Sequence, residues 1–122
     1  MSAEGAQKTT RFLKLCDTFN IPIVSLVDEP GFLIGPEAEK EGTILHGTQA
    51  VLACTESTVP WTTVMIRKSF GVAAAAHYGP DGYVLAWPSS ESGPLPLEGG
   101  VAVAFKKEIA AAKDPEAKRK EL

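Results

Sequence analysis

The sequence predicts an α/β fold in which a mostly parallel sheet is flanked by helices. Segments with helical and strand-like patterns alternate along the 122 residues, and the connections between them are short. This alternation is typical of parallel strands joined by crossover helices. The segment 21–28 (IPIVSLVD) is short, rich in β-branched residues and apolar at both alternations, which favours a strand covered on both faces.

A helix and this strand begin the pattern. The helix is expected over residues 6–19, where four apolar residues share one face, namely Phe12, Leu15, Cys16 and Phe19. Pro22 is compatible with the strand because it stands at its start. Residues 29–37 (EPGFLIGPE) contain two prolines and two glycines, and they are therefore expected to form a loop.

The pattern continues with a second helix over residues 43–57. Its expected stripe consists of Ile44, Gly47, Val51 and Cys54. A second buried strand is expected over 61–66, a short helix of small residues over 72–78, a turn over 79–82 and a third strand over 83–87. A last helix covers about 101–112, and a charged helical tail occupies about 113–122. A chain of this length fits a single domain.

Charge and composition exclude several classes of function. The net charge of −3 and the isoelectric point of about 5.4 argue against nucleic acid as a partner, since phosphate binding needs clustered cations. The chain has no apolar run of the ~20 residues that a membrane span needs and no signal-like start. Cys16 and Cys54 lie within apolar patterns, so we expect buried free thiols and a cytoplasmic location.

Few side chains near the ends of the first two strands suit catalysis. Asp28 and Glu29 are adjacent, and neighbours on an extended chain point in opposite directions, which favours Asp28 as an acceptor that stabilises the loop. Arg67 and Lys68 fit a solvated rim, and Ser69 lacks the context of a nucleophile elbow.

The two histidines and the known ligand motifs add no catalytic candidate. His46 stands beside Gly47 in a helix, where packing between helices is expected. His77 ends the alanine-rich helix, where the helix dipole favours a cation. The sequence holds no phosphate-binding loop motif, and neither histidine has a metal partner at short spacing, so we expect no metal in this domain.

The backbone after the second strand offers a different kind of site. Gly71 leads into a helix whose first residues are small (GVAAAA), and the first amides of a helix lack internal acceptors and carry the positive end of its dipole. Such amides can stabilise a developing oxyanion. The alternative is that residues 73–76 are small because the helix packs tightly on a neighbour, and the pattern alone favours this alternative.

The order of the motifs indicates a family. The stretches CDTFNIP, DEPGF, TVPW, RKSFG and AWP follow one another between about residues 8 and 109. Together they resemble the C-terminal half of the carboxyltransferase (beta) subunit of biotin-dependent acyl-CoA carboxylases, the propionyl-, acetyl- and methylcrotonyl-CoA carboxylase family. The resemblance implies a crotonase-like spiral of ββα units and a single C-terminal-type carboxyltransferase domain over 1–122.

The same resemblance implies a reaction and a set of site residues. The domain would transfer a carboxyl group from carboxybiotin to an acyl-CoA. The backbone amides of Val72 and Ala73 would form the biotin-side oxyanion hole. The remaining implied residues would shape the substrate pocket and its entrance, and these are Phe70, Gly71, Pro30, Gly31 and Phe32.

Two positions depart from the pattern of the family. Val72 stands where a second glycine is usual, and Ala75 stands where an acidic residue that bears on the choice of acyl group is frequent. The partners implied are an acyl-CoA, biotin on its carrier protein, an N-terminal-type carboxyltransferase domain and further copies in a homo-oligomer. Two alternatives stay open: a non-catalytic assembly domain derived from the family, and a stand-alone crotonase-like decarboxylase or hydrolase.

Overall fold

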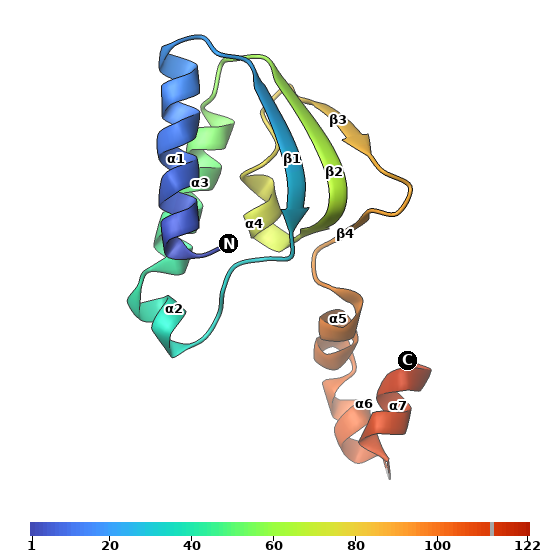
Figure 1. Ribbon diagram of the computed structural model, residues 1–122. Helices are drawn as coiled ribbons and strands as arrows, with labels where there is room; N and C mark the ends of the chain where they lie inside the picture. The colour runs from blue at the N-terminus through green and yellow to red at the C-terminus, as the bar shows by residue number, and fades with distance from the viewer. Residues whose placement is uncertain (113) are drawn as a thin grey trace.

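A parallel sheet and a layer of helices form the body of the chain, in a computed structural model that describes residues 1–112 and 114–122 (Figure 1). Within this described part the elements are, in order, α1 (Ala3–Thr18), β1 (Ile23–Glu29), α2 (Pro36–Lys40), α3 (Thr43–Thr55), β2 (Trp61–Phe70), α4 (Gly71–Ala75), β3 (Tyr83–Ala86), β4 (Glu91–Gly93), α5 (Leu97–Ala104), α6 (Lys106–Ala111) and α7 (Pro115–Glu121). The predicted parallel sheet with flanking helices is confirmed.

All the strand pairs of the sheet run parallel, and β2 is the central strand. It pairs with β1 on one side and with β3 on the other, and its last residues pair with β4. The register against β1 shifts near the end, because Val27 lies opposite Met65 whereas Glu29 lies opposite Ser69. In this interval β2 has two more residues than β1, and the two strands still end together.

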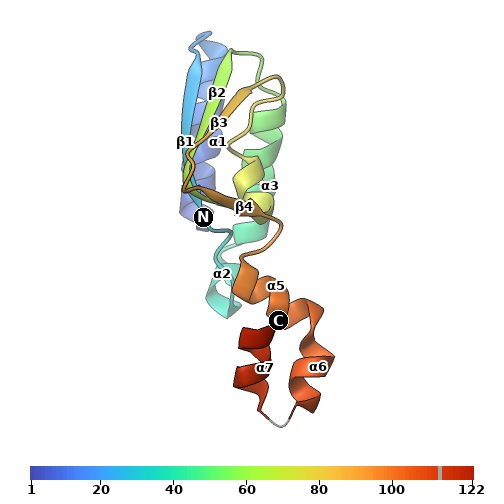
Figure 2. The same ribbon diagram turned by 90° about the vertical axis from the view of Figure 1, so that its right-hand side faces the viewer.

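Helices α1, α3 and α4 cover one face of the sheet (Figures 1 and 2). The main apolar core lies between these helices and the strands, and it consists of Leu13, Cys16, Ile23, Ala53, Cys54, Val59 and Trp61. Helices α5, α6 and α7 contact one another and extend away from this body. The sheet therefore has a covered face and an open face.

Alanines allow three helices to meet closely. Ala6 of α1, Ala50 of α3 and Ala76 at the end of α4 form a second buried cluster, each at most 1% exposed. Ala73 and Ala74 are buried as well. Small side chains permit this close approach, since interiors are packed to high density. Tight packing therefore explains much of the alanine run. This is the alternative that the sequence pattern alone favoured.

Hydrogen bonds from neighbouring elements fix the residues that follow α4. The carbonyl oxygen of His77 accepts from Thr63 Oγ1 at 2.8 Å and from Trp61 Nε1 at 3.0 Å. The carbonyl oxygen of Tyr78 accepts from Cys54 Sγ at 2.9 Å. The Tyr78 hydroxyl lies 2.6 Å from Ser69 Oγ. The chain leaving α4 is thus attached to β2 and α3.

The expected apolar stripe of the first helix is mostly wrong. Phe12, Leu15 and Phe19 are at least half exposed, and only Cys16 of the four expected residues is buried. The buried face of α1 consists of Ala3, Ala6, Leu13 and Cys16. Contact with α3 selects the small residues of α1, because two helices approach closely only where their side chains are short. In α3 likewise, Ile44 is 52% exposed, while Gly47 and Cys54 are buried as expected.

The expectation that the first strand is covered on both faces is also wrong for this chain. Ile23 and Val27 are buried under the helices, whereas Val24 and Leu26 are 67% and 62% exposed. The apolar pattern of the strand is real, but no described element packs on the second face. The residue pattern of β1 would suit burial on both faces, and among the described elements only one face is covered.

Several element boundaries differ from those expected. Strand β2 continues to Phe70 because its last residues pair with β4, a strand that was not predicted. Helix α4 begins one residue early, at Gly71, and ends at Ala75. The expected last helix is divided at Phe105 into α5 and α6, and α2 was not predicted. Residues 115–121 of the charged tail are helical as expected, and Asp114 caps them by accepting from two backbone amides; residue 113 lies outside the described residues.

Both cysteines are buried free thiols, as predicted. Burial raises the pKa of Cys54 to about 11, so its thiol stays protonated and donates to Tyr78 O. No helix in the described ranges is long and apolar enough to cross a membrane.

Gly79→Ala should destabilise the chain by about 1–3 kcal/mol, because overpacking forces buried groups apart. A Cβ at this position would lie 2.5–2.6 Å from atoms of Trp61, which is buried in the core. Gly99→Ala is the matched control, since no atom lies within 4 Å of its added Cβ and alanine favours a helix. Urea unfolding of both variants measures the difference. Equal stabilities would contradict the packing of Trp61 on Gly79.

Acid should destabilise the chain partly through His77. Burial lowers the pKa of His77 in the folded state, so the unfolded chain binds more protons below its ordinary value of about 6.5. The contribution of His77 to the free energy of unfolding is fully present above about pH 6.5, and it decreases as the pH drops towards the pKa of the folded state. Urea unfolding at several pH values should therefore give a weaker pH dependence for His77→Asn. An identical pH dependence would show that His77 contributes nothing.

Candidate functional site

An apolar cleft lies where the loop after β1, the start of α4 and the segment after β4 come together. Its volume is about 440 Å³. All seven residues expected at the biotin side line it, namely Pro30, Gly31, Phe32, Phe70, Gly71, Val72 and Ala73. The two loops that carry them are 38 residues or more apart in sequence, and the parallel pairing of β1 and β2 brings them together.

The wall formed by residues 70–73 turns at a glycine. Phe70 is buried at the end of β2 in extended conformation, and Gly71 follows with a φ of +64°. A Cβ at Gly71 would also lie 3.3 Å from the carbonyl oxygen of Pro94. The left-handed conformation and the close carbonyl both favour glycine here. This turn directs the chain from the sheet into α4 at the edge of the cleft.

The amides of Val72 and Ala73 belong to the first turn of α4, where no intrahelical acceptor is in reach. Within the described ranges no side chain caps this helix, and no turn or loop hydrogen bond is donated by either amide. Ala73 is fully buried, whereas the side chain of Val72 is 66% exposed at the cleft. Both amides therefore lack a partner among the described residues; Val72 is exposed beside the apolar cleft, and Ala73 lines the cleft but has no exposed surface of its own.

The opposite wall is held by a buried carboxylate. Glu29 is 8% exposed, and its Oε1 accepts from the amide of Gly31 at 3.1 Å and from the amino group of Met1 at 2.8 Å. Phe32 extends from this loop and lies against Gly47 of α3. The loop that carries Pro30, Gly31 and Phe32 is thus attached at both ends of its turn.

Asp28 and Glu29 point in opposite directions, as expected, and have different roles. Asp28 is exposed, and both of its carboxylate oxygens lie 3.1 Å from Arg67 Nε. The hydrogen bond from Arg67, together with one from the amide of Lys68, lowers the pKa of Asp28. Asp28 therefore joins β1 to β2, while Glu29 rather than Asp28 holds the loop. Arg67 is exposed, as predicted for a rim, whereas Lys68 is only partly exposed.

The remaining sequence candidates lie outside the cleft. His46 accepts from Gln7 Nε2 at 2.8 Å, which leaves its Nδ1–H to donate to Gln49 Oε1 at 3.2 Å. It therefore joins α3 to α1, as expected for packing between helices. Ser69 is buried against Tyr78. His77 lines a different groove, between α1 and β1. Burial lowers the pKa of His77, whereas the position at the end of α4 was expected to favour its protonated form.

Among the residues that the structure describes, six more line the cleft, and sequence reasoning missed them. They are Ile34, Ile44, Thr48, Pro94, Leu95 and Pro96. Three of them follow β4, and a strand of three residues gives too short a pattern to recognise. The only available signal was the proline pair in GPLP, which marks an irregular segment without saying where it lies.

The lining restricts what this cleft can do chemically. The lining residues that the structure describes are apolar side chains, one threonine and backbone groups, and none of them has an ionisable side chain. These described side chains therefore offer no general acid or base. Backbone amides in an apolar surrounding can stabilise negative charge on a ligand oxygen, because preorganised dipoles act strongly where water is excluded.

The comparisons with known proteins agree with one another on the family. The chain matches the carboxyl transferase domain family over residues 1–122. It is 43% identical, over its whole length, to the propionyl-CoA carboxylase carboxyltransferase subunit of Haloferax mediterranei, of which it covers 24%. It is 44% identical, over 99% of its length, to the methylmalonyl-CoA carboxyltransferase 12S subunit of Propionibacterium freudenreichii subsp. shermanii, of which it also covers 24%.

Solved structures agree with these relatives. The transcarboxylase 12S structure with methylmalonyl-coenzyme A and methylmalonic acid bound superposes with a TM-score of 0.86 at 44% identity, covering 99% of this chain and 24% of that one. The chain thus spans about a quarter of the length of the relatives it matches. From the family match over every residue and the shared crotonase-like fold, we conclude that the chain belongs to the carboxyl transferase domain family.

Proposed function

We propose that the chain is the biotin-facing part of a carboxyltransferase domain from a biotin-dependent acyl-CoA carboxylase. In this proposal the assembled enzyme transfers a carboxyl group from carboxybiotin to an acyl-CoA. The observation that carries it is the apolar cleft with the free amides of Val72 and Ala73 on its wall. Membership of the carboxyl transferase family supports the same reaction.

The cleft fits the group that the family implies. Biotin has an apolar bicyclic body and one strongly polar urea carbonyl. A cleft of about 440 Å³ with Phe70, Phe32 and Ile34 in its lining suits the body, and two unpaired amides suit the carbonyl. When bound, carboxybiotin supplies the carboxyl group and, after its loss, a basic ureido group.

In this proposal, residues of the chain bind the biotin group and polarise its urea carbonyl. The amides of Val72 and Ala73 donate to the urea oxygen, and they stabilise the negative charge that develops there. Phe70 is buried and keeps the turn at Gly71 fixed. The loop held by Glu29 excludes water from the other side. Donors that are already oriented lose little free energy to reorganisation during the reaction.

The partners are part of the proposal. The acyl-CoA would be bound by an N-terminal-type carboxyltransferase domain, and biotin would arrive on its carrier protein. The transcarboxylase 12S structure shows hexamer assembly and substrate binding to a multienzyme core, and we propose a homo-oligomer here too. We also propose that residues 1–122 belong to one C-terminal-type domain in the cytoplasm. The acyl group is left open, because Ala75 stands where the family often has an acidic residue.

Val72→Pro should lower kcat for carboxyl transfer by about 10²- to 10³-fold, the usual effect of losing one oxyanion donor. Proline removes the amide hydrogen and is tolerated in the first turn of a helix, and the exposed position of Val72 leaves space for its ring. The measurement is carboxyl transfer from carboxybiotin to acyl-CoA, with the chain placed in a complete carboxyltransferase subunit.

Val72→Ala is the matched control, because it shortens the side chain and keeps the amide. It should retain activity within a few-fold of the parent. Equal loss in both variants would mean that the side chain matters and the amide does not. A subunit that transfers no carboxyl group and binds no biotin, while still assembling, would favour the assembly-domain alternative. Turnover of the acyl-CoA without biotin would favour a stand-alone decarboxylase or hydrolase.

A further inference from the structure

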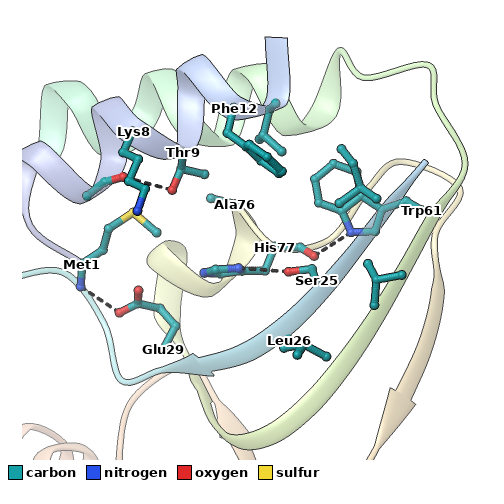
Figure 3. Close-up of a pocket in the computed structure, with 14 residues that line it drawn as sticks. Met1, Lys8, Thr9, Phe12, Ser25, Leu26, Glu29, Trp61, Ala76 and His77 are labelled. Carbon is teal, nitrogen blue, oxygen red and sulfur yellow. Dashed lines mark hydrogen bonds and ion pairs between the residues drawn. The ribbon is translucent and has the colours of Figure 1, made fainter. Parts of the chain in front are cut away.

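The last two residues of β1, Asp28 and Glu29, lie on opposite faces of the sheet and bind different parts of the chain. Glu29 lies on the face that the helices cover, where Figure 3 shows its carboxylate beside Met1. Through the amide of Gly31 it holds the loop on one wall of the cleft. Asp28 lies on the open face with Leu26, since alternate residues of a strand point to the same side. The partners of Asp28 belong to β2, the strand that leads to the other wall.

The part of β2 that faces Asp28 contains a bulge. The regular register with β1 stops at Met65 and resumes at Ser69, so residues 66–68 lie opposite Asp28 alone. On the other side of β2, only the three residues of β4 pair with the end of the strand. A bulge leaves its extra residues outside the backbone ladder and changes the direction of the chain that follows. That direction therefore depends on the contacts that hold residues 66–68.

The carboxylate of Asp28 replaces the missing ladder on the β1 side. Its Oδ1 accepts from the amide of Lys68 at 3.3 Å, and both of its oxygens lie 3.1 Å from Nε of Arg67. One side chain of β1 thus binds a main-chain group and a side-chain group in the bulge. Hydrogen bonds to an ionised group are stronger than neutral ones, so a single carboxylate can fix the bulge to β1.

The same contacts add little to the overall stability of the fold. The side chains of Asp28 and Arg67 are 42% and 64% exposed, and ion pairs that water reaches so easily contribute little to the free energy of unfolding. A contact that is weak for stability can still select one of several similar geometries of a bulge. The loss of Asp28 is therefore expected to change the direction of β2 rather than to unfold the chain.

The residues that follow the bulge form a wall of the cleft. Only Ser69 and Phe70 separate the bulge from Gly71, and the amides of Val72 and Ala73 come next. A helix as short as α4 does not hold its own orientation. A displacement of about 1 Å at a reacting group can lower a rate by about 10²-fold. A small change in the bulge therefore reaches the donors of the cleft.

We propose that Asp28 is a positioning residue for carboxyl transfer. By holding residues 67–68 it sets the direction of β2, so that the amides of Val72 and Ala73 face the urea oxygen of biotin. Asp28 is not among the described residues that line the cleft, and it acts through the backbone of β2. Asp28 and Glu29 thus position the two walls, although they are adjacent in sequence. The inference rests on the proposed function of the cleft.

Substitutions of Asp28 test this role in a chimera, the 12S subunit with its matching quarter replaced by residues 1–122. Asp28→Ala removes both partners of the bulge and should lower kcat for carboxyl transfer by about 10- to 100-fold, because the donors are displaced. The KM for the acyl-CoA should stay unchanged, since Asp28 touches no ligand. Asp28→Asn keeps an oxygen for the amide of Lys68 and should retain most of the activity.

Glu37→Ala is the matched control. Glu37 binds Lys40 at 2.7 Å in an ion pair that is still more exposed and lies within α2, so its loss should leave kcat unchanged. Thermal unfolding of the chimera should be the same for both alanine variants. An unchanged kcat in Asp28→Ala, or a kcat that falls only together with the unfolding temperature, would overturn the proposal. Equal losses in Asp28→Asn and Asp28→Ala would also contradict it.

Hydrogen exchange in the same chimera tests the contact without following activity. Asp28→Ala should speed exchange of the Lys68 amide, which loses its acceptor, and Glu37→Ala should not. An unchanged rate at Lys68 would overturn the proposal. The Val72→Pro test separates the two proposals. If Val72→Pro is impaired and Asp28→Ala is fully active, only the positioning role fails; if Val72→Pro is fully active, the donor role of the amides fails and the positioning role fails with it.

Discussion

The attachment of two consecutive residues, His77 and Tyr78, determines where the short helix α4 lies. A helix of five residues is too short to be stable alone. Three donors from β2 and α3 reach the carbonyl groups of these residues, and the Tyr78 hydroxyl binds Ser69 at the far end of β2. Both ends of the 69–78 segment are therefore held by the same strand. The orientation of the amides at the cleft follows from this arrangement.

The same arrangement explains why the alanine run serves two purposes. Ala74 and Ala76 are small because α4 approaches other helices closely. Val72 and Ala73 come at the other end of the helix, where neither amide has a described hydrogen-bond partner. The side chain of Val72 is exposed at the cleft, whereas Ala73 is buried like the later alanines. Packing and binding therefore act on overlapping parts of one segment, with Ala73 subject to both. A cleft whose described lining has no ionisable side chain suits the proposed reaction, in which the protein supplies dipoles and the substrate supplies the base.

The sequence predicted the fold class, the order of the main elements and the residues that meet at the cleft. These features depend on local residue patterns and on motifs, which can be recognised in the sequence without the structure. It did not predict which face of α1 is buried, since Phe12 and Leu13 are equally apolar and only contact with α3 distinguishes them. It also missed β4, because three residues become a strand only when β2 is beside them. The exposed outer face of β1 was missed for a related reason, because an apolar alternation does not by itself show whether another element packs on that face.

The register shift in β2 limits how the length of this strand can vary. Between Val27 and Glu29, β1 has one residue where β2 has three, and the excess of two keeps the alternation of faces unchanged. Ser69 therefore points to the helices, on the same side as Thr63. Removal of one residue from 66–68 would exchange the faces of Ser69 and Phe70, separating Ser69 from Tyr78 and rotating the start of α4. Insertions and deletions in this stretch are thus compatible with the cleft only in even numbers.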